Sequence, residues 1–403
     1  MARRALLGNL ALLLGVIIVM LWIFDAAVAF LPKPPGQEQR LRSAAGRAGV
    51  SLDPRSALEV MREMRDSVEI YPAVYMGNHW QERAEFRDTI MPLGGISQVR
   101  SLMCNEGDWI GYHADEHGFT NPPGAFGQRP VAIAAVGDSY TQGWCVPSGR
   151  SFTALLRREH PSLVSLGFGA SGPLMQLGQM REYLTALRPR RVLWFYYERN
   201  DLDPDLKDEL MHPVLRRYLE PGFSQNLMSR QPEIDRRLKA FVAVEESLAA
   251  VRAQAPPPRR DWPRTFVKIA KLYDLRMLLA RARAPDPPPT CCDIAAYQRV
   301  ARQAKTLVES WGGALGVVYL PSEARMSNRE TMRDSERAGD SVIGVLAGLG
   351  IPVLDLRENI RQYGSGPDLH RYEESHYNER GHRAVAELVS AWLAAGMTGE
   401  GRP

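Results

Sequence analysis

A serine lies directly after a segment that has the pattern of a buried strand. Residues 131–137, VAIAAVG, form a short apolar run ending in glycine, which is typical of a strand buried on both faces of a sheet. The hydroxyl of Ser139 would then be exposed at the carboxyl edge of the sheet, where a helix begins. Its backbone N–H would be an unpaired donor that can stabilise an oxyanion. The position predicts a catalytic nucleophile; the alternative is an ordinary helix cap formed by Asp138 and Ser139.

A histidine near the C-terminus has the surroundings that a general base for this serine would need. The stretch Glu373-Glu374-Ser375-His376 leads into the last expected helix. A carboxylate three residues before a histidine can hydrogen-bond the Nδ1–H within one turn, which sets the tautomer and stabilises the imidazolium. We therefore predict that His376 deprotonates Ser139 and that Glu373 orients His376. His382 falls within the helix and is predicted to be a packing or surface residue.

Two further polar stations follow the second and third expected strands. The segment SLGFGASGP (165–173) is rich in glycine, so its backbone can approach a ligand closely. A free glycine N–H in this segment would be a second oxyanion donor. Asn200 at the end of the third strand offers an amide donor to the same pocket, and Asp201 can fix the loop. Glycine-rich turns are common, and Asn200 could equally be a turn or cap residue.

Apolar runs and helical patterns alternate downstream of residue 130. This alternation predicts an α/β fold with a doubly wound parallel sheet, in which ligands bind at the carboxyl ends of the strands. Each station above lies just after a strand or at the start of the last helix, so the fold would bring them together. The expected strands are 131–137, 162–167, 191–197, 314–321 and 351–356, and the expected helices are 149–159, 174–187, 294–311, 330–348 and 378–396.

The four stations, in this order, resemble the SGNH hydrolases, also called the GDSL family. GDSYTQG (137–143) matches the nucleophile block of that family fully. The block around Asn200 and Asp201 has Glu198 where glycine is usual. The similarity covers residues 130–200 and 310–396.

Two other blocks depart from the family pattern. The last block matches at His376, but Glu373 replaces the usual aspartate, and Ser165 stands where asparagine is common in the glycine loop. The resemblance implies a flavodoxin-like sheet in which Ser139 attacks an ester carbonyl. It also implies an oxyanion hole made of the Ser139 N–H, the Asn200 side chain and the N–H of Gly172, with Gly169 as the less favoured choice for the last donor.

The resemblance also bounds the substrate. We expect a Ser-His-Glu esterase acting on O-acyl groups, above all O-acetyl groups, of an envelope or secreted polysaccharide, with lipid esters as the next candidate and no cofactor. An O-acyltransferase would use the same acyl-enzyme, and a non-catalytic glycan-binding or polysaccharide-assembly subunit is the alternative of another class. Trp194, Tyr196 and Tyr197 could stack on sugar rings, but strand alternation predicts that they are core residues.

The N-terminal sequence predicts a membrane anchor. Residues 5–24 are almost entirely apolar and long enough to cross a bilayer. We expect an uncleaved single-pass helix in the cytoplasmic membrane, with the globular part facing the periplasm or the cell exterior; Ala27-Val28-Ala29 leaves a cleaved leader as the alternative. In that compartment Cys104 and Cys145 could pair, whereas the sequence assigns no partners to Cys291 and Cys292.

Two regions lie outside the resemblance. We expect an anchor at 1–30, a membrane-proximal segment at 31–125, and a hydrolase-like domain at 126–398 with a helical insertion at 202–290. Within the insertion, the basic amphipathic stretch 265–283 is predicted to be a core-packing helix with a solvated face, the alternative being contact with an anionic membrane or glycan. His113 and His117 predict a solvated polar loop rather than a metal site, because no further ligand cluster accompanies them.

Composition agrees with an ordinary folded protein. The 403 residues are 45% hydrophobic and 24% charged, which excludes disordered, collagenous and coiled-coil classes. Four cysteines exclude a scaffold built from disulfides. The net charge of +4 is too small to argue for a nucleic-acid partner.

Overall fold

The computed structural model describes residues 2–30, 36–75, 90–254, 262–283, 293–327 and 334–397. The chain forms two compact units. One consists of Met1–Glu38 and Ala249–Thr290, and the other of Gln39–Leu248 and Cys291–Pro403. The expected active-site residues all belong to the second unit. The adjacent Cys291 and Cys292 lie outside the described residues.

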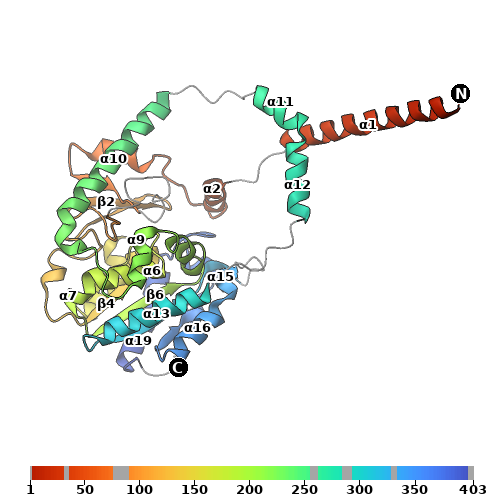
Figure 1. Ribbon diagram of the computed structural model, residues 1–403. Coiled ribbons are helices and arrows are strands. Elements are labelled where there is room, and N and C mark those ends of the chain that lie inside the picture. The colour runs from red at the N-terminus through yellow and green to blue at the C-terminus, as the bar shows by residue number, and fades with distance from the viewer. Residues whose placement is uncertain are drawn as a thin grey trace. The chain divides into compact units, whose positions relative to one another are not determined.

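The second unit is built on a parallel sheet to which β4 and β6 belong (Figure 1), and its five strands have the order β5-β4-β6-β7-β8. This confirms the predicted doubly wound α/β fold, and the order is that of flavodoxin-like sheets. β4, the first strand of this sheet along the chain, lies between β5 and β6. Because the three strands are parallel, the segments that follow them leave the sheet at the same edge. The strands are β4 (Ile133–Val136), β5 (Val164–Ser165), β6 (Arg191–Tyr197), β7 (Ala314–Leu320) and β8 (Val353–Asp355).

Both faces of this sheet are buried because helices cover each of them, and successive side chains of each strand point alternately into the two cores. Trp194 and Tyr196 of β6 pack into the core on one face, together with helices α6 (Pro173–Gln179) and α13 (Ile294–Glu309). Phe195 and Tyr197 pack into the other core, with α5 (Phe152–Glu159) and α19 (Glu379–Ala394). The prediction that the three aromatic residues Trp194, Tyr196 and Tyr197 belong to the core is confirmed.

The helices begin where the sequence supplies a cap. The side chain of Asn378 accepts the N–H groups of Arg380 and Gly381 at the start of α19, and Asp293 caps α13 in the same way. Pro173 occupies the first position of α6, where its missing N–H costs nothing. Longer helices elsewhere in this unit are α2 (Gln37–Arg47), α3 (Ala57–Met64), α10 (Gln231–Gln254) and α16 (Gly339–Gly348), of which α2 and α10 run across the division between the units.

Short helical elements connect these parts. Those of α type are α4 (Ser139–Gln142), α7 (Thr185–Leu187), α8 (Lys207–Glu209), α9 (Pro213–Arg216), α14 (Glu323–Met326), α15 (Asp334–Arg337), α17 (Leu356–Asn359) and α18 (Gly366–Leu369). Met180–Leu184 is π-helical, and Asp201–Leu206 is a helical segment interrupted at Asp203, whose φ of −144° and ψ of 116° are not helical. The 3₁₀ turns are Ala125–Gly127, Ser148–Arg150, Arg217–Leu219, Leu227–Arg230 and Ile360–Tyr363.

A second, three-stranded sheet precedes the parallel one. Its order is β1-β2-β3, with β1 (Ile70–Pro72) parallel to β2 (Arg100–Asn105) and β3 (Trp109–His113) antiparallel to it. Ile70 and Leu102 share the main core with the parallel sheet, so the predicted boundary at residue 125 separates no compact units. The sequence suggested a boundary because the apolar residues of this region follow no regular period.

Two local predictions in this region have different outcomes. A disulfide joins Cys104 of β2 to Cys145, so the pairing that the sequence allowed is confirmed. The loop containing His117 is not solvated as predicted. Asp115 is buried there and accepts the N–H groups of His117 and Phe119, which folds the loop inward against Phe126.

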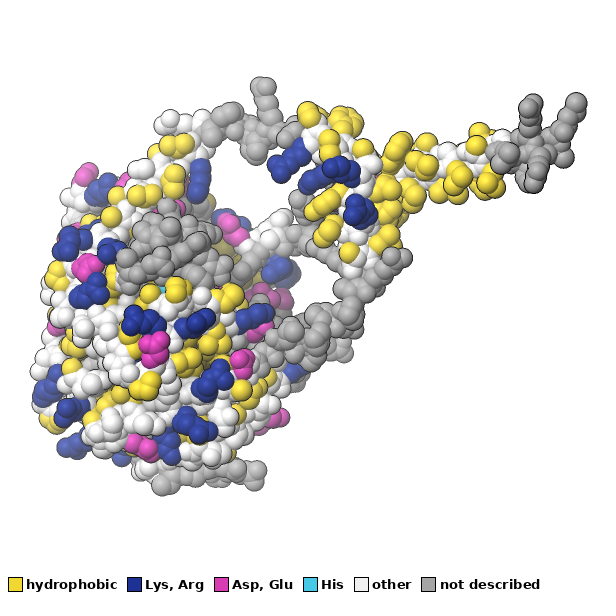
Figure 2. Space-filling view, in the orientation of Figure 1, with side chains coloured by type: hydrophobic (Ala, Val, Ile, Leu, Met, Phe, Trp, Pro, Cys, Tyr) yellow, Lys and Arg dark blue, Asp and Glu magenta, His cyan; other side chains and the backbone are white. Residues whose placement is uncertain are grey.

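The first unit contains α1 (Ala2–Phe30), α11 (Trp262–Ala270) and α12 (Tyr273–Arg283). Helix α1 is long and apolar enough over Gly8–Ala29 to cross a membrane. The N–H of Leu275 in α12 donates to Asp25 Oδ1 in α1, with 2.6 Å between the two atoms. Figure 2 shows hydrophobic side chains along α1, and hydrophobic and basic side chains together over α11 and α12.

The predicted core-packing helix at 265–283 is therefore wrong. Phe266 and Val267 are 63% and 52% exposed, and α11 buries none of its described side chains. The physical reason is that the region forms two short helices outside the unit that holds the sheet. The insertion is divided: α8, α9 and most of α10 belong to the unit with the sheet, and Ile234 and Leu238 of α10 lie in its core.

Candidate active site

Ser139 is presented by the turn between β4 and α4. Asp138 caps α4, and its side chain accepts the N–H of Tyr140. Gly137 is required because a Cβ there would meet the Phe195 carbonyl oxygen at 2.9 Å as well as the Thr141 side chain. Within the part of the chain that the structure describes, no group accepts the Ser139 N–H. The turn thus has the predicted form, with the serine at the first position of a helix.

His376 lies against this serine. The distance from Ser139 Oγ to His376 Nε2 is 2.9 Å, so the two residues that are 237 positions apart in sequence meet as expected. The imidazole ring lies beside the Tyr140 and Trp144 rings, at centroid distances of 4.8 and 5.4 Å. These rings leave Nε2 directed at the serine hydroxyl, which is the arrangement a general base needs.

The carboxylate beside His376 is Glu106, not Glu373. Glu106 Oε1 lies 2.7 Å from His376 Nδ1, and both carboxylate oxygens also accept the His376 backbone N–H. Glu373 instead forms an ion pair with Arg47, at 2.8 Å. The predicted partner is corrected for a local reason: Glu374 has a φ of +65°, so residues 373–376 do not form the helical turn that the three-residue spacing assumed.

Glu106 was not found from the sequence because it lies outside the segment that resembles a known family. It follows β2, in the turn before β3, 33 residues upstream of Ser139. The one signal available was Cys104, two residues earlier. A pairing of Cys104 with Cys145 places the 104–106 segment next to the nucleophile turn, and Glu106 with it.

The N–H of Gly172, predicted to be an oxyanion donor, is donated to another group. Glu209 Oε1 accepts it at 2.6 Å, and Glu209 Oε2 accepts the N–H of Leu174 at 2.9 Å. The carboxyl group of Glu209 therefore caps α6, for which Gly172 is the N-cap residue. This corrects the assignment of Gly172: its hydrogen atom points at a buried carboxyl group rather than at a vacant acceptor position. The alternative donor, Gly169, is also engaged, since its N–H donates to Gln142 Oε1.

Asn200 keeps part of its predicted donor capacity. Its Nδ2 donates to Asp205 Oδ2 at 2.7 Å. A side-chain amide carries two N–H hydrogens, so this bond uses one of them. Asp201 fixes the loop, as the sequence suggested, by accepting the Tyr197 N–H at 2.9 Å.

His382 packs inside the protein. It is fully buried, and its Nδ1 accepts the N–H of Phe152 at 3.2 Å. Burial lowers the pKa of His382 to about 3, which keeps the ring neutral and able to accept this bond. Of the two roles predicted for His382, packing or surface, the structure shows packing.

The segment after Asn200 carries acidic groups with raised pKa values. Burial, with the charge of Asp205 as the second cause, raises the pKa of Glu209 to about 8. Burial, followed by the charge of Asp138, raises the pKa of Asp205 to about 8. These groups favour their neutral forms at neutral pH, which reduces the repulsion between them.

The raised pKa of Glu209 predicts a pH-dependent stability. The folded protein holds this proton up to about pH 8, whereas the unfolded chain releases it near the ordinary value of 4.5. Between these values the folded state binds more protons, so the contribution of Glu209 to the free energy of unfolding decreases as the pH rises from about 4.5 to about 8. Urea unfolding at pH 5 and pH 8 should show a smaller difference for Glu209→Gln than for the unchanged protein. An equal difference in both proteins would contradict this.

Comparisons with known proteins add the following. No family model matches the sequence, and no curated protein matches it. Similar solved structures include the acetyl xylan esterase AlAXEase (10% identity, TM-score 0.37) and a lipase/acylhydrolase from Enterococcus faecalis (10%, 0.38). A third is a member of the lipolytic G-D-S-L family from Veillonella parvula (13%, 0.35).

The extent of these likenesses is similar in all three cases. They cover 65%, 67% and 65% of this chain and 100%, 99% and 98% of the other chains, respectively. At TM-scores below 0.5 the likeness supports no conclusion about activity.

Proposed function

We propose that this protein is a serine esterase that cleaves acyl esters through Ser139, His376 and Glu106. The observation that carries the proposal is the continuous contact from Ser139 Oγ to His376 Nε2, at 2.9 Å, and from His376 Nδ1 to Glu106 Oε1, at 2.7 Å. The same order of hydroxyl, imidazole and carboxylate activates the nucleophile of serine hydrolases on unrelated folds.

The chemistry follows from these contacts. His376 Nε2 takes the proton of the Ser139 hydroxyl as Oγ attacks the ester carbonyl, and then gives that proton to the leaving alcohol. Water attacks the resulting acyl-serine with His376 again as the base, which releases the acid and restores the serine. Glu106 holds Nδ1 protonated, so that Nε2 is the nitrogen that can accept a proton.

Two donors are proposed for the oxyanion. One is the Ser139 N–H at the start of α4, and the other is the Asn200 amide hydrogen that Asp205 does not use. Gly172 is omitted because Glu209 accepts its N–H. The oxyanion hole of this protein would therefore have two donors rather than three.

Removal of the Asn200 amide tests this assignment. Asn200→Ala should lower kcat for ester hydrolysis by about 10²- to 10³-fold with a smaller change in KM, because an oxyanion donor acts mainly in the transition state. Steady-state kinetics with p-nitrophenyl acetate give both constants. Asn359→Ala on α17 is the matched control and should behave like the unchanged protein. A change in KM alone for Asn200→Ala would contradict the role.

The proposed substrate class is an O-acyl ester, with O-acetyl groups of an envelope polysaccharide as the first candidate. Trp144 supports this choice: its ring is partly exposed and lies nearly parallel to the His376 ring, with 26° between the planes. The ring also packs against Tyr75, so the part of it suited to contact a sugar is its exposed portion beside the catalytic base. We propose further that α1 anchors the chain in the cytoplasmic membrane and that the catalytic unit faces the periplasm or the cell exterior, where such polysaccharides occur.

The deciding experiment uses the full chain in detergent. We would measure acetate release from p-nitrophenyl acetate and labelling by a fluorophosphonate, beside His376→Ala. The esterase proposal is supported if the unchanged protein shows turnover and labelling and His376→Ala loses both. Labelling without turnover would favour an acyltransferase that lacks its acceptor, to be tested with polysaccharides. If the unchanged protein gave neither turnover nor labelling, the proposal would be overturned and a non-catalytic subunit would be favoured.

A further inference from the structure

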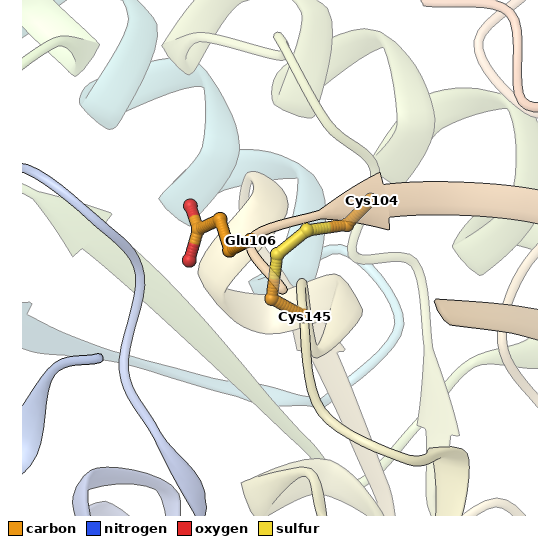
Figure 3. A group of neighbouring side chains, drawn as sticks. All are labelled: Cys104, Glu106 and Cys145. Carbon is orange, nitrogen blue, oxygen red and sulfur yellow. A yellow bond between two sulfur atoms is a disulfide. The ribbon is translucent and has the colours of Figure 1, made fainter. Parts of the chain in front are cut away.

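The glutamate of the site is attached to the nucleophile turn by a disulfide. Cys104 in β2 is bonded to Cys145, and their Cα atoms are 5.3 Å apart. Glu106 follows Cys104 by two residues, and Ser139 precedes Cys145 by six. Figure 3 shows the Glu106 carboxylate close to the disulfide that links the end of the strand to the segment after α4. The bond thus joins the segment that bears the acid to the segment that bears the nucleophile.

The apolar cluster immediately around this junction is small, although Leu102 of β2 also packs in the main core. The two cysteines belong to a small buried cluster, separate from the two cores around the parallel sheet. Its other buried members are Met103, Tyr112 and Ala114. A cluster of this size contributes few contacts that could hold the β2–β3 turn against α4 if the bond were absent.

Arg371 is the second connection between the same two segments. Its Nη2 donates to the Cys145 carbonyl oxygen at 2.9 Å, and its Nη1 donates to the Glu106 carbonyl oxygen at 3.3 Å. These bonds fix the backbone at the two ends of the junction. They leave the Glu106 side chain dependent on how closely β2 approaches the turn after α4.

We propose that the Cys104–Cys145 disulfide is the positioning device for Glu106, so that the esterase is fully active only when this bond is formed. The proposal rests on the proposed function. A dithiol such as dithiothreitol would break the S–S bond, becoming a cyclic disulfide itself, and leave Cys104 and Cys145 as two thiols. The Glu106 carboxylate would then move relative to His376 Nδ1. A misplacement of about 1 Å is enough to cost about 10²-fold in rate.

The test combines reduction with a double-mutant cycle. Cys104→Ser/Cys145→Ser should lower kcat of the full-length protein by about 10²-fold with p-nitrophenyl acetate. The same pair of changes in a Glu106→Gln background should cost much less, because the carboxylate to be positioned is already absent. Reduction of the native protein should reproduce the loss, and reoxidation should restore the rate, which excludes irreversible unfolding as the cause.

The chain supplies its own matched control. Cys291→Ser/Cys292→Ser removes the other two cysteines and should leave the rate and its sensitivity to dithiothreitol as in the unchanged protein. The proposal would be overturned if Cys104→Ser/Cys145→Ser kept the full rate. It would also fail if the cysteine changes cost as much in the Glu106→Gln background as in the original one.

One readout needs no substrate and separates this proposal from the proposed function. The proton between His376 Nδ1 and Glu106 should give a downfield NMR resonance that is absent in Glu106→Gln and His376→Asn. Its loss on reduction would support the positioning role even if no ester were hydrolysed. Its persistence on reduction would overturn the role even in an active esterase.

Discussion

Replacing Ser139 with alanine is expected to lower kcat for ester hydrolysis by about 10⁴- to 10⁶-fold, the range seen when the nucleophile of a serine hydrolase is removed. The alanine leaves no atom that can form the acyl intermediate. His376 and the oxyanion donors would remain, so the residual rate should still exceed that of the uncatalysed reaction. The measurement is the initial rate with p-nitrophenyl acetate over a range of substrate concentrations, which separates kcat from KM.

Ser148→Ala provides the control for this prediction. Ser148 is exposed, belongs to the 3₁₀ turn Ser148–Arg150, and lies nine residues after the nucleophile. Its replacement should change neither the rate nor fluorophosphonate labelling. If Ser139→Ala kept a substantial share of the activity, or if the label were found on another residue, the nucleophile would have to be sought elsewhere.

The parallel sheet could be predicted because each strand carries its own signal. RVLWFYY is apolar at every position but the first, which is typical of a strand buried on both faces, and the predicted range 191–197 coincides with β6. The region before residue 125 gave no such signal. In its three-stranded sheet, the three-residue strand β1 pairs with β2, about 30 residues later in the chain. No periodic pattern in the sequence predicts such a pairing.

The residues of the site differ in the same way: some could be predicted from their own segment, and one depends on a segment far away in the sequence. Ser139 and His376 were predicted correctly as neighbours because Ser139 stands in a strand–turn–helix segment and His376 stands just before the last helix, α19. The choice of Glu373 used spacing alone, and spacing implies contact only if the backbone between the residues is helical. The left-handed conformation of Glu374 removes that condition. The true partner, Glu106, comes from the other sheet, which the sequence did not reveal.

We therefore expect opposite results when Glu106 and Glu373 are each replaced by glutamine. Comparing kcat of the two variants is the sharpest test of the triad. Glu106→Gln should lower kcat by about 10⁴-fold, as expected when a neutral amide replaces the carboxylate of a triad and favours the wrong imidazole tautomer. Glu106 is suited to this role because its side chain is only 11% exposed and accepts hydrogen bonds from His376.

Glu373→Gln should leave kcat close to that of the unchanged protein. The Glu373 side chain is 37% exposed, and its ion pair with Arg47 is a surface contact of the kind that contributes about 0–1 kcal/mol to stability. Both variants keep the size of the side chain and remove only its charge, so kcat for p-nitrophenyl acetate can be compared directly. A larger loss for Glu373→Gln than for Glu106→Gln would restore the carboxylate that the three-residue spacing suggested. The expected order instead means that the acid of the site is supplied by the β2–β3 turn and not by the parallel sheet, so this turn is part of the catalytic apparatus.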